Sequence, residues 1–487
     1  MGSVLKRRDF LKAIGLGVSS LAVPGCLQAY KTHTKRPNIL FFFTDDQRFD
    51  TIHLLGNEQI ITPNIDRLVR SGMSFTNAYI MGSMAGAVCM PSRSMLMTGR
   101  TLFHLEEDIY IIPEEHTQLP ETLRKAGYTS FHTGKWHQDA KALTRSFSTG
   151  GKVFFGGMSD HYRVPVFDFN HNGIYPSREE LRELRREENI KKRKKARHSG
   201  ELFSNTAIKF LRDYEGEAPF FMYISYTAPH DPRQAPEKYL DMYDIEEIIL
   251  PKNFMPEHPF DNGEVTRDEK LVPTPRTPNE IRKHVRDYYA VITHLDAQIG
   301  RVLAALKETG KFENTIIVFA SDNGLAVGRH GLMGKQNLYE HSIKVPLIMS
   351  GPGIGKGQKC DAFCYLLDVY PTLCDLTGVC IPLSVEGKSL ASAIRDPKRK
   401  VRDTLFFAYR DIQRGVRDER YKLIEYVVKG KSTTQLFDLQ ADPLELDNLA
   451  DNPAYAGHLK RLRKELLLWK EELGDSSEFW QDYDCGS

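Results

Sequence analysis

Unbroken apolar runs alternate along the chain with longer segments in which apolar residues recur every three or four positions. Residues 38–43 form an almost continuous apolar run, typical of a strand buried on both faces of a parallel sheet. Similar runs occupy 219–225, 315–320 and 345–349, and residues 281–309 place their apolar side chains on one helical face. Strands that alternate with helices predict an α/β fold with a large, mostly parallel sheet sandwiched by helices.

Toward the end of the chain the apolar segments become shorter. Strand-like pieces at 404–409, 415–417, 422–428 and 435–439 precede a polar amphipathic helix at 458–473. Closely spaced short strands of this kind predict a smaller antiparallel sheet with a helix. We therefore expect a catalytic domain at 36–395 and a C-terminal subdomain at 396–487, after a leader at 1–35.

The leader has the pattern of an export signal. Arg7 and Arg8 precede a modest apolar stretch at 13–23, which is too short to span a bilayer as a permanent helix. The pair resembles the signal that the bacterial Tat export machinery reads, and the alternative is an uncleaved basic amphipathic start. Cys26 ends a loose lipoprotein cleavage box from which Pro24 departs. The leader predicts a periplasmic, envelope-anchored or outer-membrane lipoprotein, or secreted protein, with Cys26 as its candidate lipid anchor.

Charge excludes one class of partner. The 487 residues have a formal net charge of +2, so no global field attracts nucleic acid. A basic run at 191–197 is typical of a solvated helix or loop, although it would also attract an anionic polymer.

Seven cysteines are too few and too scattered for a disulfide scaffold. The cluster from Cys360 to Cys380 lacks the spacing of a zinc site, and one disulfide within it stays an open alternative.

Two pairs of oxygen-bearing residues directly follow apolar strands. Asp45 and Asp46 end the first strand, and Asp322 and Asn323 end the strand at 315–320. Open α/β sheets bind ligands at the carboxyl edge, and hard oxygen ligands favour calcium or magnesium over zinc. A single aspartate is more often a cap or turn residue. Two pairs in equivalent places predict a metal site.

Cys89 lies in a different setting from the other cysteines. Pro91 is typical of the first turn of a helix, which would place Cys89 at a helix N-terminus, where anions are favoured. Arg93 would then lie one turn away on the same side. For an isolated cysteine, a buried structural role would be the better interpretation.

The segment from Cys89 to Arg100, CMPSRSMLMTGR, resembles the signature C-x-P-S-R-x-x-x-[LM]-T-G-R of type I sulfatases in the alkaline-phosphatase-like superfamily. The resemblance extends over residues 36–448. It implies that a separate maturation enzyme converts Cys89 to formylglycine (3-oxoalanine), whose hydrate provides the nucleophilic oxygen. It also implies one calcium ion, with magnesium as second choice, held by Asp45, Asp46, Asp322, Asn323 and an oxygen of the modified Cys89.

Further motifs of the family follow in the expected order, and they imply the remaining roles. Lys135 and Lys335 would bind sulfate oxygens, and Arg93 would steady the hydrate. His230, after a buried strand, would protonate the leaving alcohol, and His137 would help to reform the aldehyde. The motifs are G-K-W-H at 134–137, P-H at 229–230, S-D-N-G at 321–324, G-K at 334–335 and a C-terminal motif at 436–449.

The resemblance leaves two alternatives and an open substrate. A formylglycine-dependent phosphonate or phosphate monoester hydrolase is the nearest one, although such enzymes more often carry histidine where Asn323 stands. The other is a carbohydrate-binding relative without catalysis. We expect a sulfated polysaccharide or oligosaccharide as substrate. Polar residues at 258–264 and 267–269 are either sugar-binding or a capped surface turn.

Overall fold

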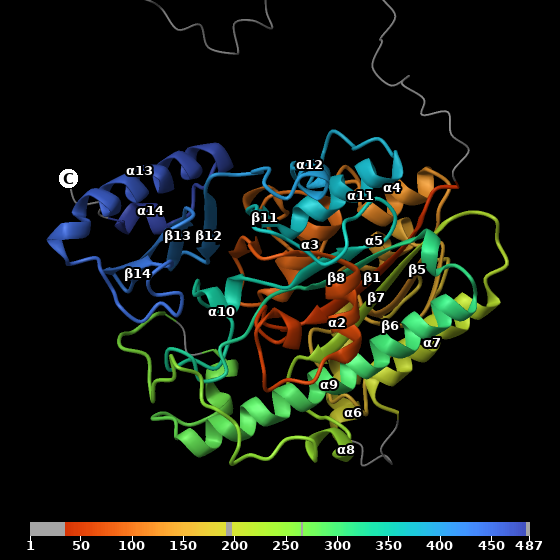
Figure 1. Cartoon of the computed structure of the whole chain (residues 1–487), viewed down its shortest axis with the longest axis horizontal. Coiled ribbons are helices and arrows are strands. Elements are labelled where there is room, and N and C mark those ends of the chain that lie inside the picture. The colour runs from red at the N-terminus through yellow and green to blue at the C-terminus, as the bar shows by residue number, and fades with distance from the viewer. Residues whose placement is uncertain (1–34, 191–196, 264–265, 484–487) are drawn as a thin grey trace, which may run out of the picture. The chain divides into compact units, whose positions relative to one another are not determined.

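The computed structural model describes residues 35–190, 197–263 and 266–483 (Figure 1). The predicted leader with Arg7, Arg8 and Cys26, and the basic run at 191–196, lie outside the described residues. Within the described part of the chain, no helix combines the length and the apolar character needed to cross a bilayer.

The larger sheet has eight strands in the order β10-β2-β9-β8-β1-β7-β5-β6. All neighbouring pairs are parallel except those of β9, which is antiparallel to both β8 and β2. The four strands β8, β1, β7 and β5 are therefore adjacent, and their carboxyl ends share one edge. The bounds are β1 (Asn38–Asp45), β2 (Gly72–Phe75), β5 (Thr129–Lys135), β6 (Thr149–Phe154), β7 (Phe220–Pro229), β8 (Thr315–Ser321), β9 (Leu347–Ser350) and β10 (Gln358–Cys360).

Helices cover both faces of this sheet (Figure 1). In β1, Leu40 and Phe42 pack with one layer of helices, whereas Phe41 and Phe43 pack with the other. A strand buried on both faces needs apolar residues at every position, which explains the unbroken run at its centre. One layer contains α2 (Pro63–Ser71), α7 (Ser199–Asp213) and α9 (Pro278–Glu308); the other contains α3 (Cys89–Thr98), α4 (Leu119–Lys125), α5 (Ala140–Ser146) and α11 (Val369–Thr377).

The smaller sheet has five strands in the order β15-β14-β13-β12-β4. Four of them form an antiparallel meander, and α13 (Ala456–Leu473) packs against it. The fifth, β4 (Gly82–Ser83), comes from far earlier in the chain and pairs in parallel with the end of β12. The meander consists of β12 (Leu405–Tyr409), β13 (Gln413–Arg417), β14 (Tyr421–Val428) and β15 (Lys431–Asp438). The predicted fold class is confirmed.

Three cysteines of the C-terminal cluster lie in different elements. Cys360 ends β10, Cys364 begins β11 (Cys364–Tyr365) and Cys374 lies in α11, and all three are buried free thiols rather than members of a disulfide. The remaining elements are β3 (Ala78–Tyr79), α6 (Arg178–Ile190), α8 (Glu237–Leu240), α10 (Glu340–Ile343), α12 (Ala391–Arg395), α14 (Phe479–Asp482), and 3-10 turns at His53–Leu55, Leu102–His104, Asp268–Leu271, Phe312–Asn314, Leu366–Asp368 and Pro453–Tyr455.

A buried ion cluster joins the smaller sheet to the loops of the larger one. Glu340 of α10 accepts a hydrogen bond from Tyr79 at 2.6 Å. Its carboxylate also lies 3.2 Å from both Arg417 of β13 and Lys422 of β14. Burial opposes the charge, but Lys422 and then Arg417 overcome it and lower the pKa of Glu340 to about 2. The two sheets therefore share a carboxylate that stays ionised.

Replacing Glu340 with alanine should destabilise the protein by about 3–5 kcal/mol, because Arg417 would be left buried without this anion and Lys422 would keep only Glu445, at 2.7 Å. Urea denaturation at neutral pH measures this loss. Lys209→Ala is the matched control, since it breaks an exposed pair with Asp213 and should change stability by less than about 0.5 kcal/mol. Equal effects of the two substitutions would contradict a structural role for Glu340.

Candidate active site

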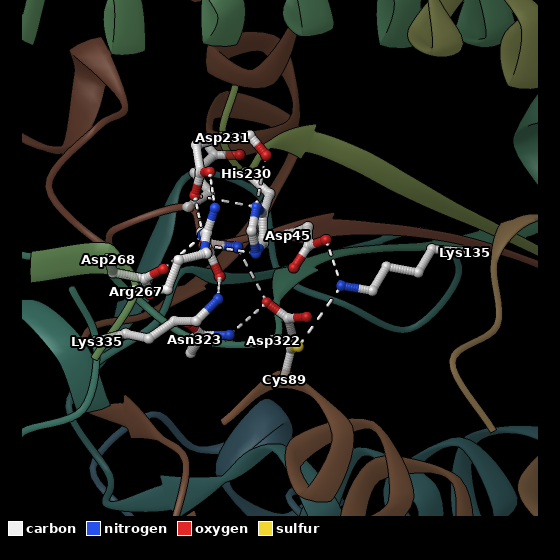
Figure 2. Close-up of polar contacts among 12 residues, drawn as sticks. Asp45, Cys89, Lys135, His230, Asp231, Arg267, Asp268, Asp322, Asn323 and Lys335 are labelled. Atoms are coloured by element: carbon white, nitrogen blue, oxygen red, sulfur yellow. Dashed lines mark hydrogen bonds and ion pairs between the residues drawn. The ribbon is translucent and has the colours of Figure 1, made fainter. Parts of the chain in front are cut away.

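The functional side chains predicted from the sequence converge at the shared carboxyl edge of β8, β1, β7 and β5. Each of these four adjacent parallel strands ends in one of the motifs, so chain segments far apart in the sequence meet there (Figure 2). The structure brings together all ten candidate residues, and every one of them is buried: Asp45, Asp46, Cys89, Arg93, Lys135, His137, His230, Asp322, Asn323 and Lys335.

The backbone at two strand ends explains why these side chains point into one place. Successive side chains of a strand face opposite sides of the sheet, yet the carboxylates of Asp45 and Asp46 both point into the site. Asp46 has φ 66°, a left-handed conformation that redirects its side chain. Its N–H donates to Asp322 at 3.0 Å and its carbonyl accepts from Tyr288 at 2.6 Å, which hold this conformation.

Gly134 allows the backbone of β5 to direct the next side chain into the site. Its φ is 102°, and a Cβ there would lie 1.9 Å from the carbonyl oxygen of Ser225 on β7. Only glycine allows the two strands to approach this closely, and the next residue, Lys135, thereby enters the site. The glycine of the G-K-W-H motif is thus required by the backbone.

Cys89 is the first residue of α3, where the positive end of the helix dipole points toward its side chain. Its Sγ lies 3.6 Å from Nζ of Lys135 and 3.5 Å from Nδ1 of His137. Burial raises the pKa of the Cys89 thiol, and the nearby lysines only partly oppose this. The unmodified thiol is therefore protonated at neutral pH and a poor nucleophile.

Three buried carboxylates lie beside Cys89. Burial and then the neighbouring Asp322 raise the pKa of Asp45 to about 6. For Asp322 burial acts in the same direction, but Arg93 and then Lys135 overcome it and lower the pKa. Each carboxylate has a different nearest cation: Asp45 lies 2.6 Å from Lys135, Asp46 lies 2.5 Å from Lys335, and Asp322 lies 2.8 Å from Arg93.

Several oxygens in this group fit a metal ion. Asp45 Oδ1, Asp46 Oδ2 and Asn323 Oδ1 are buried and have no hydrogen-bond donor among the described residues. Buried polar atoms are nearly always satisfied, so such a group needs an explanation. Ligand atoms of Asp45, Cys89 and Asp322 lie within 4.8 Å of one another, as do those of Asp45, Asp46 and His230. Oxygen donors at this spacing fit Ca²⁺ or Mg²⁺.

His230 stands on the other side of the carboxylates. Its Nδ1 lies 2.9 Å from the carbonyl oxygen of Asp231, and a carbonyl can only accept, so Nδ1 carries a proton. Its Nε2 faces Asp46 Oδ2 at 3.6 Å. Nε2 is therefore the ring atom that is available to exchange a proton inside the site.

A chain of polar contacts leads from His230 toward Lys335 (Figure 2). Arg267 forms a two-pronged ion pair with Asp231, which approaches His230 Nδ1 to 3.3 Å. Bidentate pairs of this kind fix orientation as well as charge. The chain of contacts continues from Arg267, which donates to Asp268 at 2.5 Å. Gln336 also donates to Asp268, at 3.2 Å, and its side-chain oxygen accepts from the backbone N–H of Lys335 at 3.0 Å.

Only part of this chain of contacts could be predicted from the sequence. Arg267 and Asp268 belong to the polar stretch for which a sugar-binding role and a surface turn were both open. The structure divides that stretch, because Asp261 caps a turn and pairs with exposed Lys429, whereas Arg267 and Asp268 join the site. The remaining members, Asp231 and Gln336, directly follow motif residues, and this adjacency was the available signal.

Comparison with known proteins agrees with this geometry. The sulfatase family profile matches residues 37–379, and the profile named N-sulphoglucosamine sulphohydrolase, C-terminal, matches residues 328–472. An arylsulfatase of Clostridium perfringens is 31% identical over 485 residues, covering 92% of this chain and 96% of the relative. An N-acetylglucosamine-6-O-sulfatase of Bacteroides thetaiotaomicron is 25% identical over 531 residues, covering 94% and 89%.

A solved structure has the same fold. It shows a protein in complex with its substrate, D-glucosamine-2-N,6-O-disulfate, and it superposes with a TM-score of 0.73 at 23% identity, covering 91% of this chain and 99% of that one. The chain belongs to the sulfatase family, within the alkaline-phosphatase-like superfamily. It is a sulfuric ester hydrolase, as the signature at Cys89 predicted.

Proposed function

We propose that the enzyme removes sulfate from a sulfated carbohydrate, with formylglycine at position 89 and a bound calcium ion. The observation that carries the proposal is the position of Cys89, at the start of α3 with Lys135, His137 and the carboxylate group around it. The relatives named for N-acetylglucosamine-6-O-sulfate and for a glucosamine disulfate support a sugar substrate.

Residue 89 needs modification to act. Formylglycine, made from Cys89 by a formylglycine-generating maturation enzyme, would supply a hydrate hydroxyl as the nucleophile. His137 is placed to accept a proton there, because its Nδ1 is 3.5 Å from Sγ of Cys89. Burial and then Lys135 hold the pKa of His137 well below its usual range, so the imidazole is unprotonated at neutral pH and has a lone pair to accept a proton.

Calcium would be held by Asp45, Asp46, Asp322, Asn323 and an oxygen of the modified residue 89, with magnesium as second choice. The ion supplies positive charge that stabilises the developing anion. The ammonium groups that balance Asp45 and Asp46, those of Lys135 and Lys335, would then be available to bind sulfate oxygens. Arg93 donates to Asp322 and Ser225, which fix its guanidinium in the site, where it would steady the hydrate at residue 89.

The substrate class is tested by assaying the wild-type enzyme on a panel of sulfated monosaccharides and oligosaccharides. Phosphate and phosphonate monoesters are measured in parallel. We expect released sulfate from at least one sugar sulfate, with a kcat/KM well above that for any phosphorus ester. Asn323 favours sulfate over phosphorus esters, because the phosphonate and phosphate monoester hydrolases more often carry histidine at this position. The opposite order would support the alternative phosphonate or phosphate monoester hydrolase.

Residue 89 should be an aldehyde when the chain is made alongside a maturation enzyme, and peptide mass spectrometry detects it. Cys89→Ala should abolish turnover with little change in folding. Cys374→Ala, which removes another buried thiol, is the control that should stay active. A fully active preparation with unmodified Cys89 would exclude this mechanism.

Export is also part of the proposal. Arg7 and Arg8 would direct the folded enzyme through the Tat machinery to the periplasm or, with Cys26 lipidated, to the envelope. Because Cys89 is buried, the modification has to precede folding and hence export. The same mass spectrometry on the Arg7→Lys, Arg8→Lys variant should find modified, active enzyme in the cytoplasm. Unmodified Cys89 there, despite the maturation enzyme, would place the modification after export.

Calcium binding should weaken in acid. The metal-free pKa of Asp45 is raised to about 6, so below that pH a proton must leave before the metal binds. Calorimetry on chelated protein should show affinity falling up to about tenfold per pH unit below 6, with proton release, and little change above 7. Asp322→Ala should lose the metal in elemental analysis. Stoichiometric zinc, or full activity after exhaustive chelation, would exclude calcium.

His230 is proposed to protonate the leaving sugar oxygen. His230→Ala should therefore reduce kcat on a sugar sulfate by about 10²–10⁴-fold and on an aryl sulfate, whose phenolate leaves readily, by much less. Arg267→Met removes the ion pair with Asp231, so Asp231 should no longer fix the imidazole of His230. We expect a smaller loss of kcat that is again greater on the sugar sulfate than on the aryl sulfate, and a partial recovery in Arg267→Lys. Lys429→Met, at an exposed pair, is the control. Equal losses on both substrates would assign His230 to binding alone.

A further inference from the structure

A cavity of about 230 Å³ opens on the side of His137 away from the carboxylates. Met90, the residue after Cys89, and His137 itself form part of its lining. None of the roles described above uses this cavity. Its size is below that of drug-sized ligand pockets and suits a single small ring.

The cavity borders the reaction centre, and the imidazole of His137 lies between the two. Nδ1 of that ring faces Sγ of Cys89 at 3.5 Å. On the opposite ring edge lies Gly157, which also lines the cavity, and a Cβ there would be 2.9 Å from Nε2. Glycine therefore leaves this edge of the imidazole open. A ligand in the cavity would lie across this imidazole from the group bound at residue 89.

Helix α6 contributes two positive charges to the lining. Arg178 and Arg182 lie one helical turn apart, so they share a face, and both line the cavity. Arg178 covers the ring of Tyr110 at 4.6 Å. Its Nη1 lies 3.3 Å and 3.4 Å from the two carboxylate oxygens of Asp108. That pair is about half exposed and weakly held.

Arg182 makes no hydrogen bond or ion pair with any residue whose side chain is described. The acidic residues of α6 nearest to it, Glu179, Glu180 and Glu183, are not part of the lining. The lining is therefore cationic on the α6 side. Guanidinium groups match the planar oxygen pairs of carboxylates and the oxygens of sulfate.

Aromatic side chains form the remaining wall. Phe155 and Phe167 lie with ring centroids 6.2 Å apart, and Tyr110 completes the set. Flat apolar surfaces of this kind suit the C–H face of a sugar ring, while the polar groups fix its orientation. The cavity thus combines a surface for a ring with receptors for an anion.

We propose that this cavity is a subsite for a second, negatively charged sugar unit, next to the unit that loses its sulfate. Arg178 and Arg182 bind its carboxylate or sulfate group, and the aromatic wall packs against its ring. The inference rests on the proposed carbohydrate sulfatase function and names the class of substrate: a glycan with an anionic group on adjacent sugars.

Three sulfated disaccharides test the subsite. They share the same sulfated unit, and the neighbouring unit is neutral, a uronate or a sulfate ester. The wild-type enzyme should prefer the charged ones. In Arg178→Gln, Arg182→Gln, kcat/KM for the charged disaccharides should fall about tenfold or more, mainly through KM, with the neutral disaccharide and an aryl sulfate within about twofold. Comparing uronate with sulfate ester identifies the preferred anion.

Arg212→Gln is the matched control, because Arg212 is an exposed arginine of α7 that pairs with Glu308 away from the cavity. It should leave all three disaccharides unchanged. Equal loss on neutral and charged disaccharides in the double variant, or no wild-type preference for charge, would overturn the subsite and leave the proposed function standing. Wild-type hydrolysis of aryl sulfate but of no sulfated saccharide would overturn both.

Discussion

The burial of three carboxylates at adjoining strand ends is the constraint on which the rest of the site depends. Asp45, Asp46 and Asp322 meet because β1 and β8 are neighbours and parallel. Like charges out of water repel strongly, so the fold must supply cations at fixed places. Arg93 comes from α3, Lys135 from β5 and Lys335 from the loop after β8, and the elements that bring them in are thereby fixed around the sheet edge.

The same groups link structure to chemistry. In the proposed function, a lysine that neutralises an aspartate within the folded chain would become available for a sulfate oxygen once a metal ion shares that carboxylate. Histidine follows a different rule. Burial, and then the cations around it, keep His137 neutral, whereas His230 lies between the carboxylate of Asp46 and a bidentate Asp231–Arg267 pair. Two imidazoles of one site thus differ in their electrostatic surroundings because they follow different strands, β5 and β7.

Much of this architecture could be predicted from the sequence, because a strand buried on both faces leaves an unmistakable apolar run. The convergence of Asp45 and Asp322 followed from the rule that parallel strands end at one edge. Other features carry no local signal. Gly82–Ser83 is a two-residue strand recognisable only from its partner β12, and the Asp231–Arg267 pair joins positions remote in sequence. The orientation of Arg178 toward a cavity depends on how α6 packs, which its mixed charge pattern does not determine.

The short strand β4 has a consequence for the timing of synthesis. It lies just ahead of Cys89, and it pairs with Ala408 and Tyr409 near the far end of the chain. At roughly 5–20 residues per second, a ribosome needs on the order of tens of seconds to proceed from the one to the other. Until then the segment that precedes α3 has no sheet to join. The native surroundings of the segment ahead of Cys89 are therefore incomplete for most of the chain's translation, and the synthesis of β12 is what allows them to form.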